Sequence, residues 1–217
     1  MIAIQDQVIH TRNYRKHIMR DLTVTDVCRH CHNSTETIQH ITGACMAIAQ
    51  TDYKHRHDQA AAIIHQCLAF KYHLLSEKIP YYKYKPQTVL ESQYYKIYWD
   101  RTIITDKTIH HNRPDITVHN KRDKTVFLID IAIPNTNNIS STFTGKIAKY
   151  TELSIELKTQ WKVDKVKTVP IILSSTGIIP LTLHTSLATI DIHPCTYKLL
   201  QKAIILNTCR IVRKFLS

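Results

Sequence analysis

Residues 125–133 read Thr-Val-Phe-Leu-Ile-Asp-Ile-Ala-Ile, and this stretch decides the fold that we expect. A nearly continuous apolar run is typical of a central strand buried on both faces of a sheet. The charged turn 120–124 precedes it, and a second apolar run predicts another buried strand over 167–174. A helix over about 145–161, with several N-cap residues just before it, would connect the two strands as a crossover.

The same patterns assign the rest of the chain. Apolar residues at helical spacing predict a helix over 58–75, and residues 5–20 read as a polar helix or a linker. Further helices are expected over 88–99, 181–189 and 197–216, and short strands over 102–106 and 115–119. The order strand, strand, strand, helix, strand predicts a mixed α/β sheet.

Two prolines, Pro80 and Pro86, enclose the sequence Tyr-Tyr-Lys-Tyr-Lys and mark the expected domain boundary. On this division, residues 1–24 are an N-terminal helix or linker. Residues 25–79 are a cysteine-rich segment with the helix that follows it, and residues 87–217 are the α/β domain.

The balance of charge is strongly basic. The chain carries 29 Lys and Arg against 17 Asp and Glu, which gives a formal net charge of +12 and a pI near 9.4. This favours a polyanionic partner, nucleic acid first, although a basic balance also serves solubility or attraction to an acidic membrane surface. No run approaches the roughly 18 apolar residues of a membrane span, and the charged N-terminus has no apolar signal core. We therefore expect an intracellular protein with no membrane partner.

Four residues stand at metal-ligand spacing, since Cys28, Cys31, His40 and Cys45 form the pattern Cys-x2-Cys-x8-His-x4-Cys. Thiolate and imidazole suit Zn²⁺, and four protein ligands are typical of a structural site that staples a short, loop-rich segment. We therefore predict a zinc knuckle. Nearby alternatives to His40 are His30, His32, His55 and His57. The remaining cysteines, Cys67, Cys195 and Cys209, are expected as small buried residues.

The carboxylate of Asp130 lies inside the apolar strand. It demands a cation, a hydrogen-bond donor or a cavity, because burying an unpaired charge is costly. Asp115 begins the preceding strand within Arg113-Pro114-Asp115. If the turn 120–124 makes a hairpin, the two acids approach across adjacent strands and can hold Mg²⁺ or Mn²⁺ between them. Two acids and a lysine around such a metal hydrolyse phosphodiesters in nucleases of the PD-(D/E)xK type.

The lysine is displaced from the plain form of that pattern, because Ala132 stands two residues after Asp130. The following helix offers Lys146 and Lys149 instead. At about 100° per residue, Lys146 lies on the apolar stripe with Tyr150, and Lys149 lies at its edge. We expect Lys146 to be the catalytic amine and Lys149 to contact a phosphate. Exchanged roles, or a solvated helix face, are the alternatives.

Several other side chains are candidates for contact with nucleic acid. Arg113 would meet a phosphate beside the acid pair. Lys83 and Lys85 alternate with tyrosines, so that the lysines would hold a backbone while the rings stack on bases. Packing inside the protein is the alternative for these tyrosines. Glu91 is either a further carboxylate of the site or a surface residue.

In this order the motifs resemble the C-terminal end of the polyprotein of non-long-terminal-repeat retrotransposons that carry a restriction-enzyme-like endonuclease. The resemblance rests on the knuckle, then Arg113-Pro114-Asp115, then the strand 128–134, then Lys146-Ile147-Ala148-Lys149-Tyr150. It implies an α/β fold with a PD-(D/E)xK core. It also implies Asp115 and Asp130 as metal ligands, Lys146 or Lys149 as a catalytic lysine displaced into the helix, and Tyr150 beside the site.

In that family the knuckle lies between a reverse transcriptase and an endonuclease that nicks target DNA to prime reverse transcription. The resemblance therefore implies a nuclear DNA endonuclease beside a reverse transcriptase domain of the same polyprotein, with DNA or RNA at the knuckle. The chain itself has no polymerase segment with a paired-Asp motif. Two rivals stay open: a remnant that binds nucleic acid without cutting it, and a zinc-stabilised interaction protein.

Overall fold

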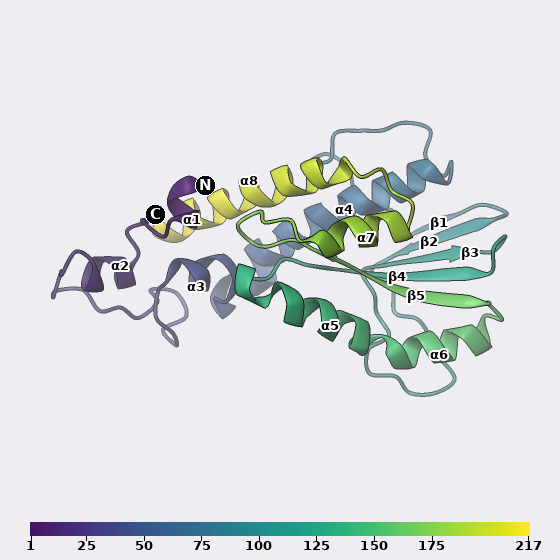
Figure 1. The fold of residues 1–217 in the computed structure, drawn as a ribbon, viewed down its shortest axis with the longest axis horizontal. Coiled ribbons are helices and arrows are strands. Elements are labelled where there is room, and N and C mark those ends of the chain that lie inside the picture. The colour runs from purple at the N-terminus through teal and green to yellow at the C-terminus, as the bar shows by residue number, and fades with distance from the viewer.

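A mixed sheet of five strands lies at the centre of the molecule (Figure 1), which we describe from a computed structural model of residues 1–217. The strands are β1 (Val89–Glu91), β2 (Tyr95–Trp99), β3 (Ile116–Asn120), β4 (Thr125–Ala132) and β5 (Lys165–Ile172). They lie in the order β1-β2-β3-β4-β5; β1 to β4 pair antiparallel, and β5 pairs parallel to β4. The predicted crossover between β4 and β5 is therefore present, and the α/β class is confirmed.

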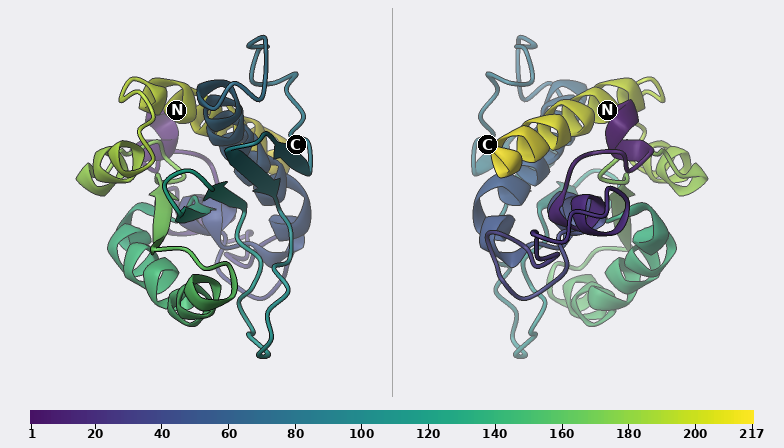
Figure 2. Two further views of the ribbon diagram at one scale, coloured as in Figure 1. Left: turned by 90° about the vertical axis from the view of Figure 1, so that its right-hand side faces the viewer. Right: turned by 90° about the vertical axis from the view of Figure 1, so that its left-hand side faces the viewer.

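Helices cover both faces of this sheet. They are α1 (Ile2–Gln5), α2 (Arg12–His17), α3 (Ile38–Gly43), α4 (Lys54–Lys71), α5 (Ile139–Lys149), α6 (Thr151–Gln160), α7 (Leu181–Thr189) and α8 (Thr196–Leu216). Short helical turns of other types span Met46–Ile48, Ala49–Tyr53 and Thr136–Asn138. Figures 1 and 2 show α4, α7 and α8 on one face of the sheet and α5 and α6 on the other. None of the helices combines the length and the apolar character that a membrane crossing requires.

Strand β4 separates two hydrophobic layers, as its apolar sequence predicts. Ile129 and Ile131 pack in the larger core with residues of α4, α7 and α8. Val126 and Leu128 pack on the opposite side with residues of α6. Because side chains alternate along a strand, Asp130 continues the face of Val126 and Leu128. Its carboxylate therefore points to the layer of α5 and α6.

The predicted helix over 88–99 is wrong, because this segment forms the hairpin of β1 and β2. Ile97 is fully buried in the core, and Tyr95 and Trp99 pack against the same core. The Ser92 hydroxyl accepts the Tyr95 N–H at 3.2 Å and closes the turn. Aromatic side chains at alternate positions fit a half-buried pleated surface, and this packing outweighs the helical spacing.

The predicted strand over 102–106 is also wrong, because these residues lie in the loop between β2 and β3. Ile103 is buried beside α6, whereas its neighbour Ile104 is 85% exposed. The Ile103 N–H donates to the Asn112 carbonyl at 2.8 Å, across the loop. Of the two adjacent isoleucines, only Ile103 packs in the core, and it anchors a loop rather than belonging to a strand.

The predicted helix over 145–161 is correct in place but not in extent. It begins at Ile139 and is divided at Tyr150 into α5 and α6. Tyr150 is fully buried, with φ −106° and ψ 10°. The remaining predicted strands and helices agree within a few residues with β3, β4, β5, α4, α7 and α8.

The cysteine-rich segment is joined to the rest of the molecule through the C-terminal helix. Ile41 packs in one cluster with Ile211 and Phe215 of α8. Helix α4 contributes Leu68 and other residues to the core beneath the sheet. Residues 80–86, the expected domain boundary, lie in the loop from α4 to β1. Buried residues of α4, before this loop, and of the strands, after it, pack in one core.

We expect the stability of the fold to depend on pH through His65, a fully buried residue of α4. Its Nδ1 forms a hydrogen bond with the Tyr84 hydroxyl at 2.7 Å, and its ring packs edge-on against Trp99. Burial lowers the pKa of His65 from 6.5 to about 4, so the unfolded chain takes up a proton that the folded chain rejects. The free energy of unfolding should therefore be unaffected by this group above pH 6.5. It should fall by about 3 kcal/mol as the pH drops from 6.5 through 4.

Urea denaturation across this pH range measures the effect. His65→Gln should flatten the decline, while His110→Gln, which replaces an exposed histidine, should leave it unchanged. An equally steep decline in His65→Gln and the wild type would contradict the prediction.

Candidate functional site

The four predicted zinc ligands come together at the knuckle. The ligand atoms of Cys28, Cys31, His40 and Cys45 all lie within 4.8 Å of one another. The Sγ atoms of Cys28 and Cys45 are 3.9 Å apart, and Cys31 Sγ is 3.3 Å from His40 Nε2. Zinc–sulfur bonds of about 2.3 Å in a tetrahedron place two sulfurs about 3.8 Å apart. The cluster therefore has the size and the donor set of a structural zinc site.

Local backbone contacts bring these ligands to one point. The Cys28 N–H donates to the Ser34 carbonyl at 2.8 Å, and His32 turns the loop with a φ of 55°. Thr37 caps α3, because its hydroxyl accepts the His40 N–H at 3.1 Å. Burial lowers the pKa of His40, which keeps its ring in the neutral form that binds metal.

A buried ion pair holds the knuckle loop to the N-terminal segment. Glu36 is fully buried, and its two carboxylate oxygens accept from the Arg29 guanidinium at 2.8 and 3.0 Å. The backbone N–H groups of Arg12 and Arg29 donate to the same carboxylate at 2.9 and 3.0 Å. Four donors satisfy the buried charge, so its desolvation is compensated.

The alternative histidines lie outside the zinc cluster. His30 packs edge-on against Phe215, with ring centroids 4.4 Å apart, and His57 lies on α4. Of the other cysteines, Cys67 and Cys209 are partly buried, but Cys195 is exposed, which corrects the expectation that it is a core residue.

Loss of one ligand should empty this site. Cys28→Ser should reduce bound zinc from about one atom per chain to near zero and lower Tm by at least about 5 °C, because the metal holds the loop closed. Metal analysis and thermal unfolding measure both effects. Cys195→Ser, outside the cluster, should keep its zinc and its Tm. Full zinc content in Cys28→Ser would show that this cysteine is not a ligand.

The second candidate site is the acid pair formed by Asp115, just before the start of β3, and Asp130, near the end of β4. Ile116 pairs with Ile129, so the same register places Asp115 opposite Asp130. Residues directly opposite on antiparallel strands have Cβ atoms about 5 Å apart and point to the same face. Asp115 Oδ2 also accepts the Ile131 N–H at 2.6 Å, which fixes the carboxylate against β4.

Asp130 is only 2% exposed, and three side chains from the crossover helices converge on it. Lys146 Nζ forms an ion pair with Oδ2, and Lys149 Nζ lies 3.5 Å from Oδ1. The Tyr150 hydroxyl donates to Oδ1 at 2.5 Å. Burial and the neighbouring Asp130 carboxylate raise the pKa of Tyr150, so it keeps its proton as a donor. The cation and the donor that a buried carboxylate requires are both present.

The charged groups of this site keep contact with solvent. The side chains of Lys146 and Lys149 are 23% and 31% exposed, and that of Asp115 is 21% exposed. A phosphate can therefore approach the two ammonium groups and Asp115 without prior unfolding of the layer, while Asp130 lies buried behind them.

A histidine that sequence reasoning placed only among alternative zinc ligands belongs to the acid pair. His57, in the first turns of α4, has Nε2 3.1 Å from Asp115 Oδ2 and Nδ1 3.1 Å from Asp58 Oδ1. Burial disfavours its charged form, but the hydrogen bonds to Asp115 and Asp58 outweigh burial and raise the pKa of His57 to about 10. Nothing in the spacing of 14 histidines marks this one, because the contact joins segments 58 residues apart.

Other predicted contact residues lie around this centre rather than in it. Arg113 is exposed and forms an ion pair with Asp100 at 2.8 Å. Lys83 and Lys85 are exposed in the loop before β1 and form no ion pair. Glu91 forms ion pairs with Lys96 of β2 and Lys121 of the turn after β3.

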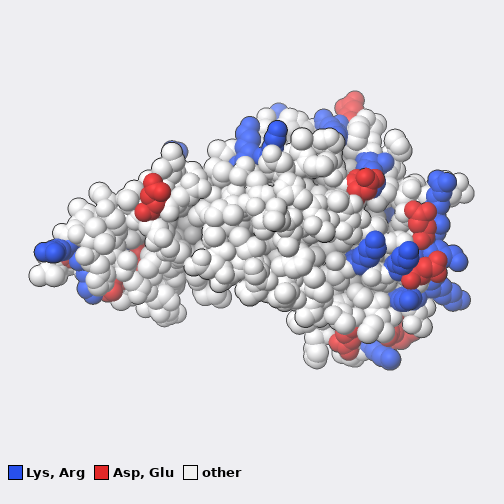
Figure 3. Space-filling model, in the orientation of Figure 1, with Lys and Arg blue, Asp and Glu red and all other residues white.

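Basic side chains also gather at the far end of the sheet, around the tips of the strands (Figure 3). Exposed members of the β3–β4 turn, of α6, of the turn after it and of the beginning of β5 are Arg122, Lys124, Lys158, Lys162, Lys165 and Lys167. None of these six forms an ion pair within the chain. They add a second surface that attracts polyanions.

Comparison with known proteins gives no relative: the chain matches no family model, and no curated protein matches it significantly.

Proposed function

We propose that this chain is a metal-dependent DNA endonuclease with a PD-(D/E)xK core, in which the zinc knuckle helps to hold nucleic acid. The observation that carries the proposal is the convergence of Asp115 and Asp130, on opposed strands, with two lysines of the crossover helix. Phosphodiester hydrolysis needs such acids to bind a cation and such amines to offset phosphate charge. The arrangement of four antiparallel strands, a crossover and a parallel strand supports the same assignment.

The acid pair suits an oxygen-seeking cation. Proteins bind Mg²⁺ through one or two carboxylates together with phosphate oxygens and water. Both hydrogen bonds of Asp115 fall on Oδ2, so its Oδ1 is free, and Asp130 presents Oδ2 to Lys146 alone. Asp115 and Asp130 would therefore hold Mg²⁺ or Mn²⁺. Such a cation, when bound, offsets charge on a phosphate oxygen and lowers the pKa of its water.

The side chains of the protein divide the remaining tasks. Lys146 orients the attacking water and offsets the charge of the pentacovalent phosphate. Lys149, the more exposed amine, contacts the adjacent phosphate. Tyr150 holds Asp130 by its hydrogen bond, and His57 holds Asp115, so these two act as positioning residues.

We further propose that the chain derives from the C-terminal part of a non-long-terminal-repeat retrotransposon polyprotein. On this proposal it nicks DNA in the nucleus beside a reverse transcriptase domain of the same polyprotein. The support is the order along the chain of zinc cluster, acid pair and lysine helix. The knuckle would contact DNA or RNA next to the cutting site.

One observation favours a second function, a module that binds nucleic acid without cutting it. Asp115 is already bound by His57, and Asp130 by Lys146. The charges of the site are therefore balanced inside the protein, and the network would then serve only the fold.

Nicking of supercoiled plasmid by the zinc-loaded protein with Mg²⁺ or Mn²⁺ decides between them. We expect the wild type to nick. Asp130→Asn and Lys146→Ala should each slow nicking by at least about 100-fold, because Asp130 would hold the cation and Lys146 would offset the charge that develops on the phosphate. Lys149→Ala should mainly weaken DNA binding.

Two matched variants control this experiment. Glu152→Gln in α6 and Lys198→Ala in α8 change exposed residues outside the site and should nick like the wild type. A folded, zinc-loaded wild type that shifts DNA in a salt-dependent manner but never nicks it would exclude the endonuclease and leave the binding module.

The positioning role of His57 has its own test. His57→Gln should lower the nicking rate about 10- to 100-fold while the affinity for uncut DNA stays unchanged, because the side chain orients Asp115 without touching phosphate. His55→Gln, an exposed neighbour on α4, is the control. Equal loss of rate and affinity in His57→Gln would instead indicate a general loss of structure.

A further inference from the structure

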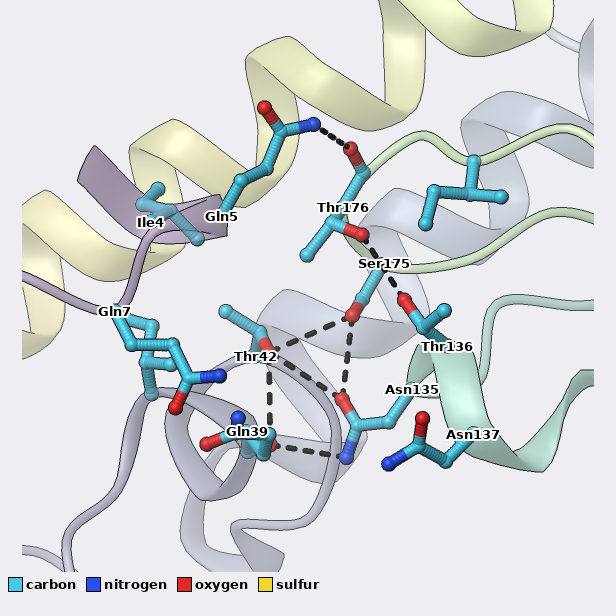
Figure 4. Close-up of a pocket in the computed structure, with 12 residues that line it drawn as sticks. Ile4, Gln5, Gln7, Gln39, Thr42, Asn135, Thr136, Asn137, Ser175 and Thr176 are labelled. Carbon is cyan, nitrogen blue, oxygen red and sulfur yellow. Dashed lines mark hydrogen bonds between the residues drawn. The ribbon is translucent and has the colours of Figure 1, made fainter. Parts of the chain in front are cut away.

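A pocket of about 330 Å³ lies just beyond the ends of the parallel strands β4 and β5 (Figure 4). This is the edge at which α/β sheets commonly bind ligands. The lining residues come from the loops after β4 and β5, the N-terminal segment and α3. None of them is charged, although the chain has a net charge of +12.

Some of the polar groups in this pocket form its frame. Asn135 Oδ1 accepts from the hydroxyls of Thr42 at 3.4 Å and Ser175 at 3.2 Å, and its Nδ2 donates to the Gln39 carbonyl at 3.1 Å. A Cβ atom at Gly43 would stand 2.7 Å from Asn135 Oδ1, so α3 packs closely on this side chain. Asn135 therefore fixes the knuckle helix to the ends of both strands.

Other polar groups are free for a ligand. The side-chain amides of Gln7, Gln39 and Asn137 are exposed and form no hydrogen bond within the protein. Figure 4 shows these three side chains around one end of the pocket. Ile178, 45% exposed, adds an apolar surface.

The chemistry of these groups disfavours phosphate as the direct ligand, because no cation faces the pocket. It suits a flat, uncharged molecule with donors and acceptors along its edge. Asn and Gln amides pair with base edges through two hydrogen bonds, and an apolar side chain packs on the base face.

We propose that this pocket takes one unstacked nucleobase of the nucleic acid on which the acid pair acts, an inference that rests on the proposed function. The distance along the chain agrees with this role. Asn135 follows Asp130 by five residues, which span at most about 18 Å. That length corresponds to about five nucleotides of a strand at 3.4 Å each. The base would therefore lie within a few nucleotides of the cut.

The test compares strands with and without bases. Fluorescein-labelled oligo-dA, oligo-dT and oligo-dC of about 12 nucleotides, and an abasic phosphodiester of the same length, are titrated with the zinc-loaded chain in the absence of Mg²⁺. The wild type should bind at least one base-bearing strand about tenfold more tightly than the abasic strand. Gln39→Ala combined with Asn137→Ala should lose most of this preference and keep the affinity for the abasic strand.

Two exposed amides at the β1 side of the sheet supply the control, because Gln87→Ala combined with Gln93→Ala should bind all strands as the wild type does. An unchanged preference in the pocket variant, or a loss shared by the abasic strand, would overturn the inference. Plasmid nicking is scored separately. A wild type that nicks but shows no pocket-dependent preference overturns the pocket alone, whereas one that shows the preference without nicking supports the pocket and not the nuclease.

Discussion

The buried carboxylate of Asp130 is the constraint on which the rest of the site depends. It is 2% exposed within a strand whose other side chains are apolar, so it requires both a donor and a cation. Tyr150 and Lys146 supply them, and both belong to the crossover between β4 and β5. The division of that crossover at Tyr150 follows, because a fully buried ring that reaches the strand draws its own backbone toward the sheet. The buried carboxylate is thus linked to the division of the crossover into α5 and α6.

The register of β3 against β4 places the second acid, Asp115, beside Asp130. A slip of one residue between β3 and β4 would turn Asp115 to the opposite face and separate it from Asp130. The turn fixes the register: Asn120 Nδ2 donates to Asp123 Oδ2 at 2.8 Å, and Lys124 adopts a left-handed backbone with φ 44°. His57 then joins Asp115 to α4 from the other layer. The acid pair is in this way held from both sides of the sheet.

Features of the fold and of the site that depend on residues close together in the sequence could be predicted, whereas features that depend on distant partners could not. The strand over 125–133, its parallel partner and the cysteine cluster depend on local pattern or short spacing, and the structure contains all three. The hairpin at 88–99 was missed because aromatic packing against α4 outweighs helical spacing. His57 was missed because its partner lies far along the chain. The approach of Lys146 to Asp130 was predictable because the apolar stripe fixes which side of α5 faces the sheet.

The placement of charge along β4 indicates how a polyanion would lie on the protein. Six of the unpaired lysines and arginines gather around Lys124, before the strand begins, whereas Asp130 lies six residues later, about 20 Å along the strand. The uncharged pocket at Asn135 and the knuckle follow beyond the other end. Because α8 packs against both the knuckle and the sheet, these parts keep a fixed spacing. On the proposed function, a bound nucleic-acid strand would therefore meet the basic surface, the acid pair and the base pocket in succession along one axis rather than at one point.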